Sequence, residues 1–287
     1  MNRRIRGSVI FCIAISLAAA PVVSCSKARE YSTWESLGQR SGTTKEVQIE
    51  RPLPASACPW AGTVSHHLLT YAQIDGWFRT LASRRDVSRF YVLSPSHWGL
   101  STQTYSLTDG SWRVKGGFVD SDRAQVASLA RKLGVKGEPR VFDGEHGVST
   151  LMPFIARYFP RAKVIAIAYH GEPPLDQPMA ARLYEALAPA FAGDARKENF
   201  LLVSTDFSHH GDRAQTAAKD ARTRKFFDAP SASSWIMAGC DNRPGIYVLS
   251  RLLDAKSECS VLYHCDSSDL TGVDDGDITS YFFSFFW

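Results

Sequence analysis

The hydrophobic residues of this chain follow two spacings, one typical of helices and one typical of buried strands. Ile74, Trp77, Phe78 and Leu81 recur at three- and four-residue intervals, which predicts an amphipathic helix over residues 74–85. Further helices are predicted over residues 120–134, 149–159, 178–191 and 242–255, and strands over residues 89–97, 162–171, 199–211, 260–268 and 278–287. Because strands alternate with helices, we expect a three-layer α/β domain whose central sheet is mixed or mostly parallel and flanked by helices.

The first 25 residues follow neither spacing and predict an export signal. Residues 1–8 carry three arginines and no acid, an uncharged apolar stretch follows, and residues 22–25 read VVSC. This ending resembles a bacterial lipoprotein cleavage box, in which Cys25 becomes the acylated first residue; a plain signal peptide is the alternative. The next residues are polar and patternless. We therefore expect a lipoprotein signal peptide over residues 1–24, a flexible tether over 25–50 and the α/β domain over 51–287.

Export and charge narrow the choice of partners. The apolar stretch is too short for a comfortable membrane span, so we expect the protein to attach to the membrane through the lipid anchor. The protein would then face the periplasm of a bacterial cell envelope. Removal of residues 1–24 lowers the formal charge from +4 to +1, because three arginines are lost. A nearly neutral chain without a basic run excludes nucleic acid as a partner.

Histidines and acids gather just beyond several of the predicted strands. In open α/β sheets, ligands bind at the carboxyl ends of the strands, so side chains placed there by different segments are expected to meet in one cleft. The side chains expected in this cleft are His66, His97, Glu145, His146, Asp206 and His209. We expect Asp206 to orient His209 by accepting its ring proton, and His209 or His146 to move protons.

Cys240 is the candidate that adds sulfur to this set. It lies just ahead of a helix opened by Pro244, where the partial positive charge of the helix N-terminus favours a thiolate. Two imidazoles and one thiolate would suit a transition metal. A disulfide with Cys58, Cys259 or Cys265 is the alternative in an oxidising compartment. The sequence contains no CxxC pair, which excludes a zinc ribbon.

Five short motifs, in order, resemble those of the Memo family, called AmmeMemoRadiSam system protein B in bacteria. The motifs are VSHHLL, LSPSHWG, DGEHGVSTLMPF, STDFSHHG and CDNRPGIYVL, and the resemblance runs from about Pro54 to the C-terminus. It implies a fold like that of the class III extradiol dioxygenases, which use non-heme iron. It also implies that His66, His97 and Cys240 are metal ligands, that Asp206 and His209 lie beside the metal, and that Glu145 and His146 line the cleft.

The resemblance leaves the ligand set and the function partly open. The family's proline before the first histidine is Ser65 here, and His67 follows directly, so His66 and His67 compete for the ligand role; we favour His66. Iron(II) is the favoured ion, followed by copper(I) and then zinc. The first hypothesis is redox or dioxygenase-like chemistry on a small substrate. The alternatives are a non-catalytic copper, iron or peptide-binding protein that uses the same cleft, and a zinc hydrolase with Asp206 as base.

Overall fold

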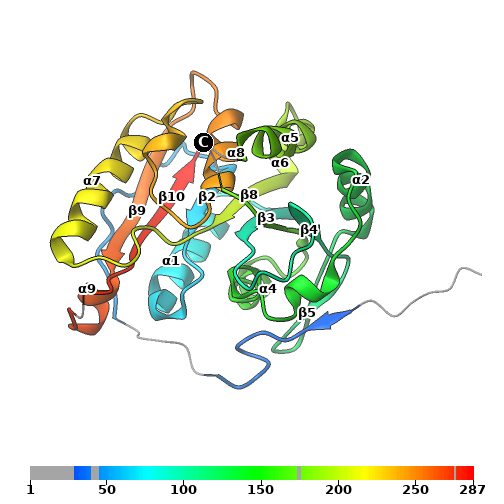
Figure 1. The fold of residues 1–287 in the computed structure, drawn as a ribbon, viewed down its shortest axis with the longest axis horizontal. Helices are drawn as coiled ribbons and strands as arrows, with labels where there is room; N and C mark the ends of the chain where they lie inside the picture. Colours follow the sequence, from blue (N-terminus) through cyan, green and yellow to red (C-terminus); the bar gives the residue numbers. More distant parts are fainter. Residues whose placement is uncertain (1–28, 40–44, 173–175, 275) are drawn as a thin grey trace, which may run out of the picture.

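The centre of the fold is a seven-stranded mixed sheet with the order β4-β7-β3-β8-β2-β10-β9 (Figure 1). The computed structural model describes residues 29–39, 45–172, 176–274 and 276–287. The strands of this sheet are β2 (Ala61–Val64), β3 (Arg89–Pro95), β4 (Tyr105–Leu107), β7 (Lys163–Tyr169), β8 (Asn199–Ser204), β9 (Cys259–Asp266) and β10 (Ser280–Phe286). Strands β7, β3, β8 and β2 are parallel, while β4 and β10 run against their neighbours. The carboxyl ends of four strands therefore lie at one edge.

Helices cover both faces of the sheet and complete the predicted three layers. The longer helices are α1 (Tyr71–Ala82), α2 (Arg123–Leu133), α4 (Met152–Tyr158), α5 (Gln177–Leu187), α7 (Arg213–Asp228) and α8 (Arg243–Leu252). Side chains of β3 alternate between two separate cores. Phe90 and Val92 pack in the core that contains α1 and α4, whereas Tyr91 and Leu93 pack in the core that contains α2, α5, α7 and α8. The expected fold class is confirmed.

Trp77 of α1 shows how closely the first helix packs on the sheet. Its side chain is fully buried, its ring stacks on Phe285 at a centroid distance of 4.6 Å, and its Nε1–H donates to the carbonyl of Ser284 at 3.0 Å. The indole thus satisfies its one polar group while burying a large apolar surface. Among the described residues, no helix is both long and apolar enough to span a bilayer.

The N-terminal segment differs from the expected tether. Strand β1 (Glu30–Tyr31) pairs in parallel with β5 (Ser111–Val114), which forms a hairpin with β6 (Gly117–Asp120). Tyr31 is 2% exposed and packs against Trp112 at a ring distance of 5.2 Å. Trp34 donates from Nε1 to the carbonyl of Thr150. Single aromatic residues hold this segment against the domain, although its hydrophobic residues follow neither the helical nor the strand spacing. The prediction of a flexible tether is therefore wrong for residues 29–39.

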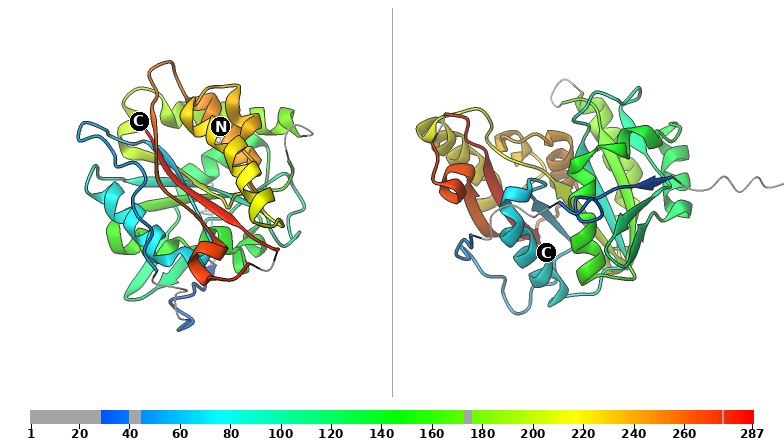
Figure 2. Two further views of the ribbon diagram at one scale, coloured as in Figure 1. Left: turned by 90° about the vertical axis from the view of Figure 1, so that its left-hand side faces the viewer. Right: turned by 90° about the horizontal axis from the view of Figure 1, so that it is seen from below.

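Strand β1 lies at the end of the molecule remote from β9 and β10, as Figure 1 and the right-hand view of Figure 2 show. Residues 45–50 also contact the domain, since the backbone N–H of Glu50 donates to the carbonyl of Leu262 at 2.8 Å. The signal peptide predicted over residues 1–24 and the predicted acylation site Cys25 lie outside the described residues.

Candidate functional site

The predicted cleft forms at the carboxyl edge of the sheet. His66, His97 and Asp206 each lie two residues beyond the end of their strands, β2, β3 and β8. His146 is the first residue of the short helix α3 (His146–Ser149), and Asp241 lies just ahead of α8. The cleft has a volume of about 290 Å³ and is lined by His66, His67, His97, His146, Asp206, His209, Asp241 and Thr279.

Two imidazoles converge on one carboxylate at the floor of this cleft. The Oδ2 atom of Asp241 lies 3.3 Å from Nε2 of His66 and 3.6 Å from Nε2 of His97. The opposite ring nitrogens are held from behind: Nδ1 of His66 lies 3.0 Å from Oγ of Ser204, and Nδ1 of His97 lies 2.5 Å from Oε1 of Glu145. Because each ring is fixed at Nδ1, both Nε2 atoms are directed toward Asp241, as in metal sites whose histidines are oriented by outer hydrogen bonds.

Two further donors, His146 and Asp206, surround His66. The ligand atoms of His66, His97 and His146 lie within 4.8 Å of one another, and so do those of His66, Asp206 and Asp241. Nδ1 of His146 and Oδ1 of Asp206 are buried and have no hydrogen-bond partner. Buried polar atoms are normally paired, so these two point to a missing partner. A cation bound to the convergent nitrogen and oxygen donors would supply one, and the residues present therefore fit a metal ion.

The pKa values describe a charged network in the metal-free protein. Burial would lower the pKa of His97, but the nearby carboxylates of Asp241 and Glu145 outweigh it and raise this pKa to about 9. The pKa of His66 is likewise raised, since Asp206 and Asp241 outweigh the effect of burial. The pKa of His146 falls to about 4 through burial and through its two cationic neighbours. At neutral pH the protonated ring of His97 thus lies beside the neutral ring of His146, and the two carboxylates favour the charged form of His66.

The structure does not place the thiol of Cys240 among these donors. Among the described residues, neither donor group includes its sulfur, whereas the next residue, Asp241, belongs to one of them. Asp241 is held by Thr205, whose Oγ1 donates to its Oδ1 at 2.7 Å, and by the backbone N–H of Asp206 at 3.0 Å. In the metal-free protein, burial raises the pKa of Cys240 to about 12, so the side chain is a neutral thiol there. Cys240 and the three other described cysteines are free, so the alternative of a disulfide does not hold for them.

Of the other residues predicted for the site, some belong to the two donor groups and the rest lie around them. His66, not His67, belongs to the donor groups; His67 places Nδ1 2.7 Å from the hydroxyl of Tyr281. Glu145 is 1% exposed and supports His97 from behind. His209 lines the cleft, but no hydrogen bond joins it to Asp206 among the described residues, and the carboxylate of Asp206 faces His66 instead. The expected Asp206–His209 pair is therefore not formed.

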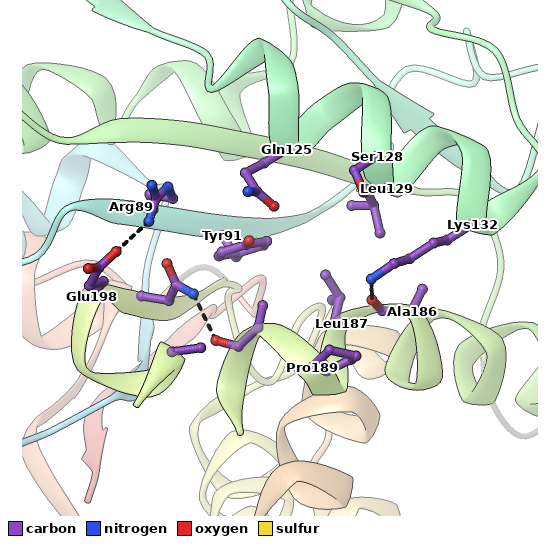
Figure 3. Close-up of a pocket in the computed structure, with 13 residues that line it drawn as sticks. Arg89, Tyr91, Gln125, Ser128, Leu129, Lys132, Ala186, Leu187, Pro189 and Glu198 are labelled. Carbon is purple, nitrogen blue, oxygen red and sulfur yellow. Dashed lines mark hydrogen bonds and ion pairs between the residues drawn. The ribbon is translucent and has the colours of Figure 1, made fainter. Parts of the chain in front are cut away.

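A second hollow of about 280 Å³ lies at the opposite edge of the sheet, where β3 and β8 begin (Figure 3). One of its two cationic residues, Arg89, is already neutralised, since the guanidinium contacts Asp122 at 2.9 Å and Glu198 at 2.7 Å. Lys132 reaches across it to the carbonyl of Ala186 at 3.4 Å. No histidine or cysteine lines this hollow among the described residues, whereas both groups of candidate metal donors found in the same residues lie in the histidine cleft.

Together, the fold and the cleft define a three-layer α/β protein with a histidine and carboxylate cluster at the carboxyl edge of its sheet. A family model described as Memo-like protein matches residues 58–281, and the chain belongs to this family. The chain is 25% identical over 208 residues to a MEMO1 family protein of Methanopyrus kandleri, a match that covers 68% of this chain and 71% of the relative. It is 22% identical over 229 residues to a MEMO1 family protein of Methanothermobacter thermautotrophicus, a match that covers 76% of this chain and 78% of the relative.

A solved structure supports the fold independently of sequence. The crystal structure of the uncharacterized protein JW3007 from Escherichia coli K12 superposes with a TM-score of 0.51 at 9% identity, and covers 78% of this chain and 98% of the other. The recognition made from the five motifs is thus confirmed at the level of family, and the architecture at the level of fold.

Proposed function

We propose that His66, His97 and Asp241 hold one transition-metal ion, with His146 and Asp206 as additional donors. The observation that carries this proposal is the approach of two fixed Nε2 atoms, at 3.3 and 3.6 Å, to a single oxygen of Asp241. Two histidines and one carboxylate are the ligand set typical of non-heme iron(II) sites. Iron(II) therefore remains the favoured ion. Copper(I) prefers sulfur ligands, and the proposed ligand set without Cys240 gives no reason to expect it.

We propose metal-dependent redox or dioxygenase-like chemistry on a small substrate as the activity. A bound iron(II) ion would supply the capacity to activate oxygen or to polarise a substrate. The pKa of His146, about 4, keeps its ring neutral near pH 7, so the ring can offer a nitrogen to the ion or accept a hydrogen bond from a substrate. His209 is available to a substrate on the wall of the cleft. Glu145 accepts from His97 and fixes which nitrogen of that ring faces the cleft.

A non-catalytic role in holding the ion is the second candidate, and the number of donors favours it. Besides His66, His97 and Asp241, both His146 and Asp206 offer an unpartnered atom. A site that keeps an open position for water or substrate is typical of catalysis, whereas a site with every position filled by protein is typical of binding alone. Oxygen consumption by the iron-loaded protein would favour the enzyme, and tight binding without turnover would favour the carrier.

We also propose that Cys25 is acylated and anchors the domain on the periplasmic face of a bacterial envelope. Support comes from the arginine-rich start, the uncharged apolar stretch and the VVSC sequence. Incorporation of a labelled fatty acid into the full chain, and its loss in Cys25→Ala, tests this part independently of the metal site.

The metal site is tested by loading the protein anaerobically with iron(II) and measuring bound metal. We expect about one equivalent in the parent and a large loss in His66→Ala, His97→Ala and Asp241→Asn. Cys240→Ser is the matched control, because it changes the residue next to Asp241 and should retain the metal. Loss of metal in Cys240→Ser with retention in Asp241→Asn would reverse the assignment and restore the thiolate.

A further inference from the structure

The chain is fixed to the domain from Arg29 onward, only a few residues after the proposed acylation site. The guanidinium of Arg29 pairs with Asp143, with Nε 2.7 Å from Oδ1, and Tyr31 follows in β1 with its ring buried. Three residues separate Arg29 from Cys25. Four residue steps of fully extended chain span at most about 14 Å. A lipid on Cys25 would therefore hold the domain against the bilayer rather than on a long tether.

The contacts of Arg29 show which part of the domain lies beside this anchor. Its partner Asp143 is the last residue of the 3₁₀ helix η2 (Pro139–Asp143). The carbonyl of the next residue, Gly144, accepts a hydrogen bond from Nε1 of Trp98 at 2.6 Å. Glu145 follows and holds His97 in the cleft. A continuous series of contacts thus joins the anchored segment, Trp98 and the mouth of the metal site.

The loop that carries Trp98 has the composition of a membrane contact. Residues 96–104 link β3 to β4 and contain no Asp, Glu, Lys or Arg. Trp98 and Leu100 are 58% and 54% exposed, on either side of Gly99, whose φ of 63° turns the chain. Tryptophan favours the membrane–water interface, and residues 98–104 carry no ionisable side chain to desolvate there, since the one titratable residue of the loop, His97, is held in the cleft by Glu145.

We propose that residues 96–104 rest on the lipid bilayer and that the metal cleft opens beside the membrane surface. This inference rests on the proposed acylation of Cys25. The ring of Trp98 lies 5.5 Å from the ring of His146, which lines the cleft, so the membrane contact borders the site itself. A substrate would then enter from the bilayer surface, as an amphiphile dissolved in the lipid does.

The test uses the full acylated chain in vesicles of phosphatidylethanolamine and phosphatidylglycerol that contain lipids brominated on their acyl chains. Bromine quenches tryptophan fluorescence only at short range. We expect quenching of the parent protein that falls at least twofold in Trp98→Phe. Trp235→Phe is the matched control, because Trp235 is buried against Tyr247 of α8, and it should leave the quenching unchanged.

Flotation of the vesicles separates the two ways in which the inference can fail. Protein that does not float with the vesicles, and behaves like Cys25→Ala, would refute the acylation and with it the contact. Protein that floats but is quenched equally in the parent and in Trp98→Phe would refute the contact alone and leave the anchor standing. Floating protein with quenching that depends on Trp98 supports both.

Discussion

The hydrogen bonds of Glu145 give the most specific prediction for the metal site. Its Oε1 accepts from Nδ1 of His97 at 2.5 Å and from the backbone N–H of Gly147 at 3.0 Å, and its Oε2 accepts from the backbone N–H of His97 at 2.9 Å. Glu145→Gln keeps the shape but leaves only one accepting oxygen. Whichever way the amide turns, its NH₂ group faces at least one N–H donor in a site that is 1% exposed.

The expected size of the effect follows from the interactions that Glu145→Gln removes in the metal-bound and in the metal-free protein. Removal of a carboxylate that supports a metal-bound histidine lowers metal affinity about 10- to 100-fold, which corresponds to about 1.4–2.7 kcal/mol. Hydrogen bonds to a charged group contribute roughly 1.5–3 kcal/mol each, so the metal-free fold should also be destabilised, by about 2 kcal/mol after partial compensation by the amide. The loss of affinity is therefore expected on top of a measurable loss of stability.

Competition with a fluorescent chelator measures the affinity, and urea unfolding measures the stability. Glu138→Gln is the control, since Glu138 also accepts from side chains, those of Thr102 and Ser106, but outside the cleft. The reasoning is refuted if Glu145→Gln binds metal within twofold of the parent, or if Glu138→Gln weakens binding as much.

Three further predictions concern pH, packing and the N-terminal segment. Because the pKa of His97 is raised to about 9, its protonated form stabilises the metal-free fold below the unfolded pKa of about 6.5, and this contribution is lost as the pH rises through 9. Metal affinity should rise over the same interval, by up to about tenfold per pH unit, in titrations at pH 7, 8 and 9; a flat profile would contradict it. Gly147→Ala should weaken metal binding several-fold although every donor is retained, since a Cβ there would collide with Oγ of Ser94 and press on Glu145. Unchanged binding would show that the first turn of α3 shifts to accommodate the methyl group. Tyr31→Ala should lower the free energy of unfolding by about 3 kcal/mol in urea, whereas a free tether at this position would give no change.

The position of the cleft was predictable from sequence because it depends on local pattern and on a general rule of topology. His66 and His97 follow apolar runs that become parallel strands, and parallel strands end at one edge. The choice between Cys240 and Asp241 depends instead on long-range contacts. The backbone of Phe207 bridges that of Cys240, and the N–H of Asp241 donates to the carbonyl of Asp206 at 3.1 Å. The only signal in the sequence was an acid directly beside the cysteine.

The helix before which Cys240 lies illustrates how two local effects compete. A helix N-terminus stabilises a nearby negative charge by about 0.3–1 kcal/mol. Burial raises the pKa of the thiol from 9.0 to about 12, which corresponds to roughly 4 kcal/mol against the thiolate. Burial therefore prevails, and its extent is a tertiary property. The same holds for Tyr31 and Trp34, whose anchoring role depends on the partners Trp112 and Thr150 far along the chain.

The proposed use of Asp241 rather than Cys240 as a ligand has a consequence for the protein's resistance to air and oxidants. Thiolates are converted to sulfenic acid or disulfides, and a site that depends on one requires a supply of reductant to remain able to bind metal. Imidazole and carboxylate groups undergo no such loss. Protein stored in air should therefore regain its full metal capacity when iron(II) is added, with no prior thiol reduction. A site built without a thiolate would therefore keep its capacity for metal under conditions in which a thiolate-dependent site is oxidised.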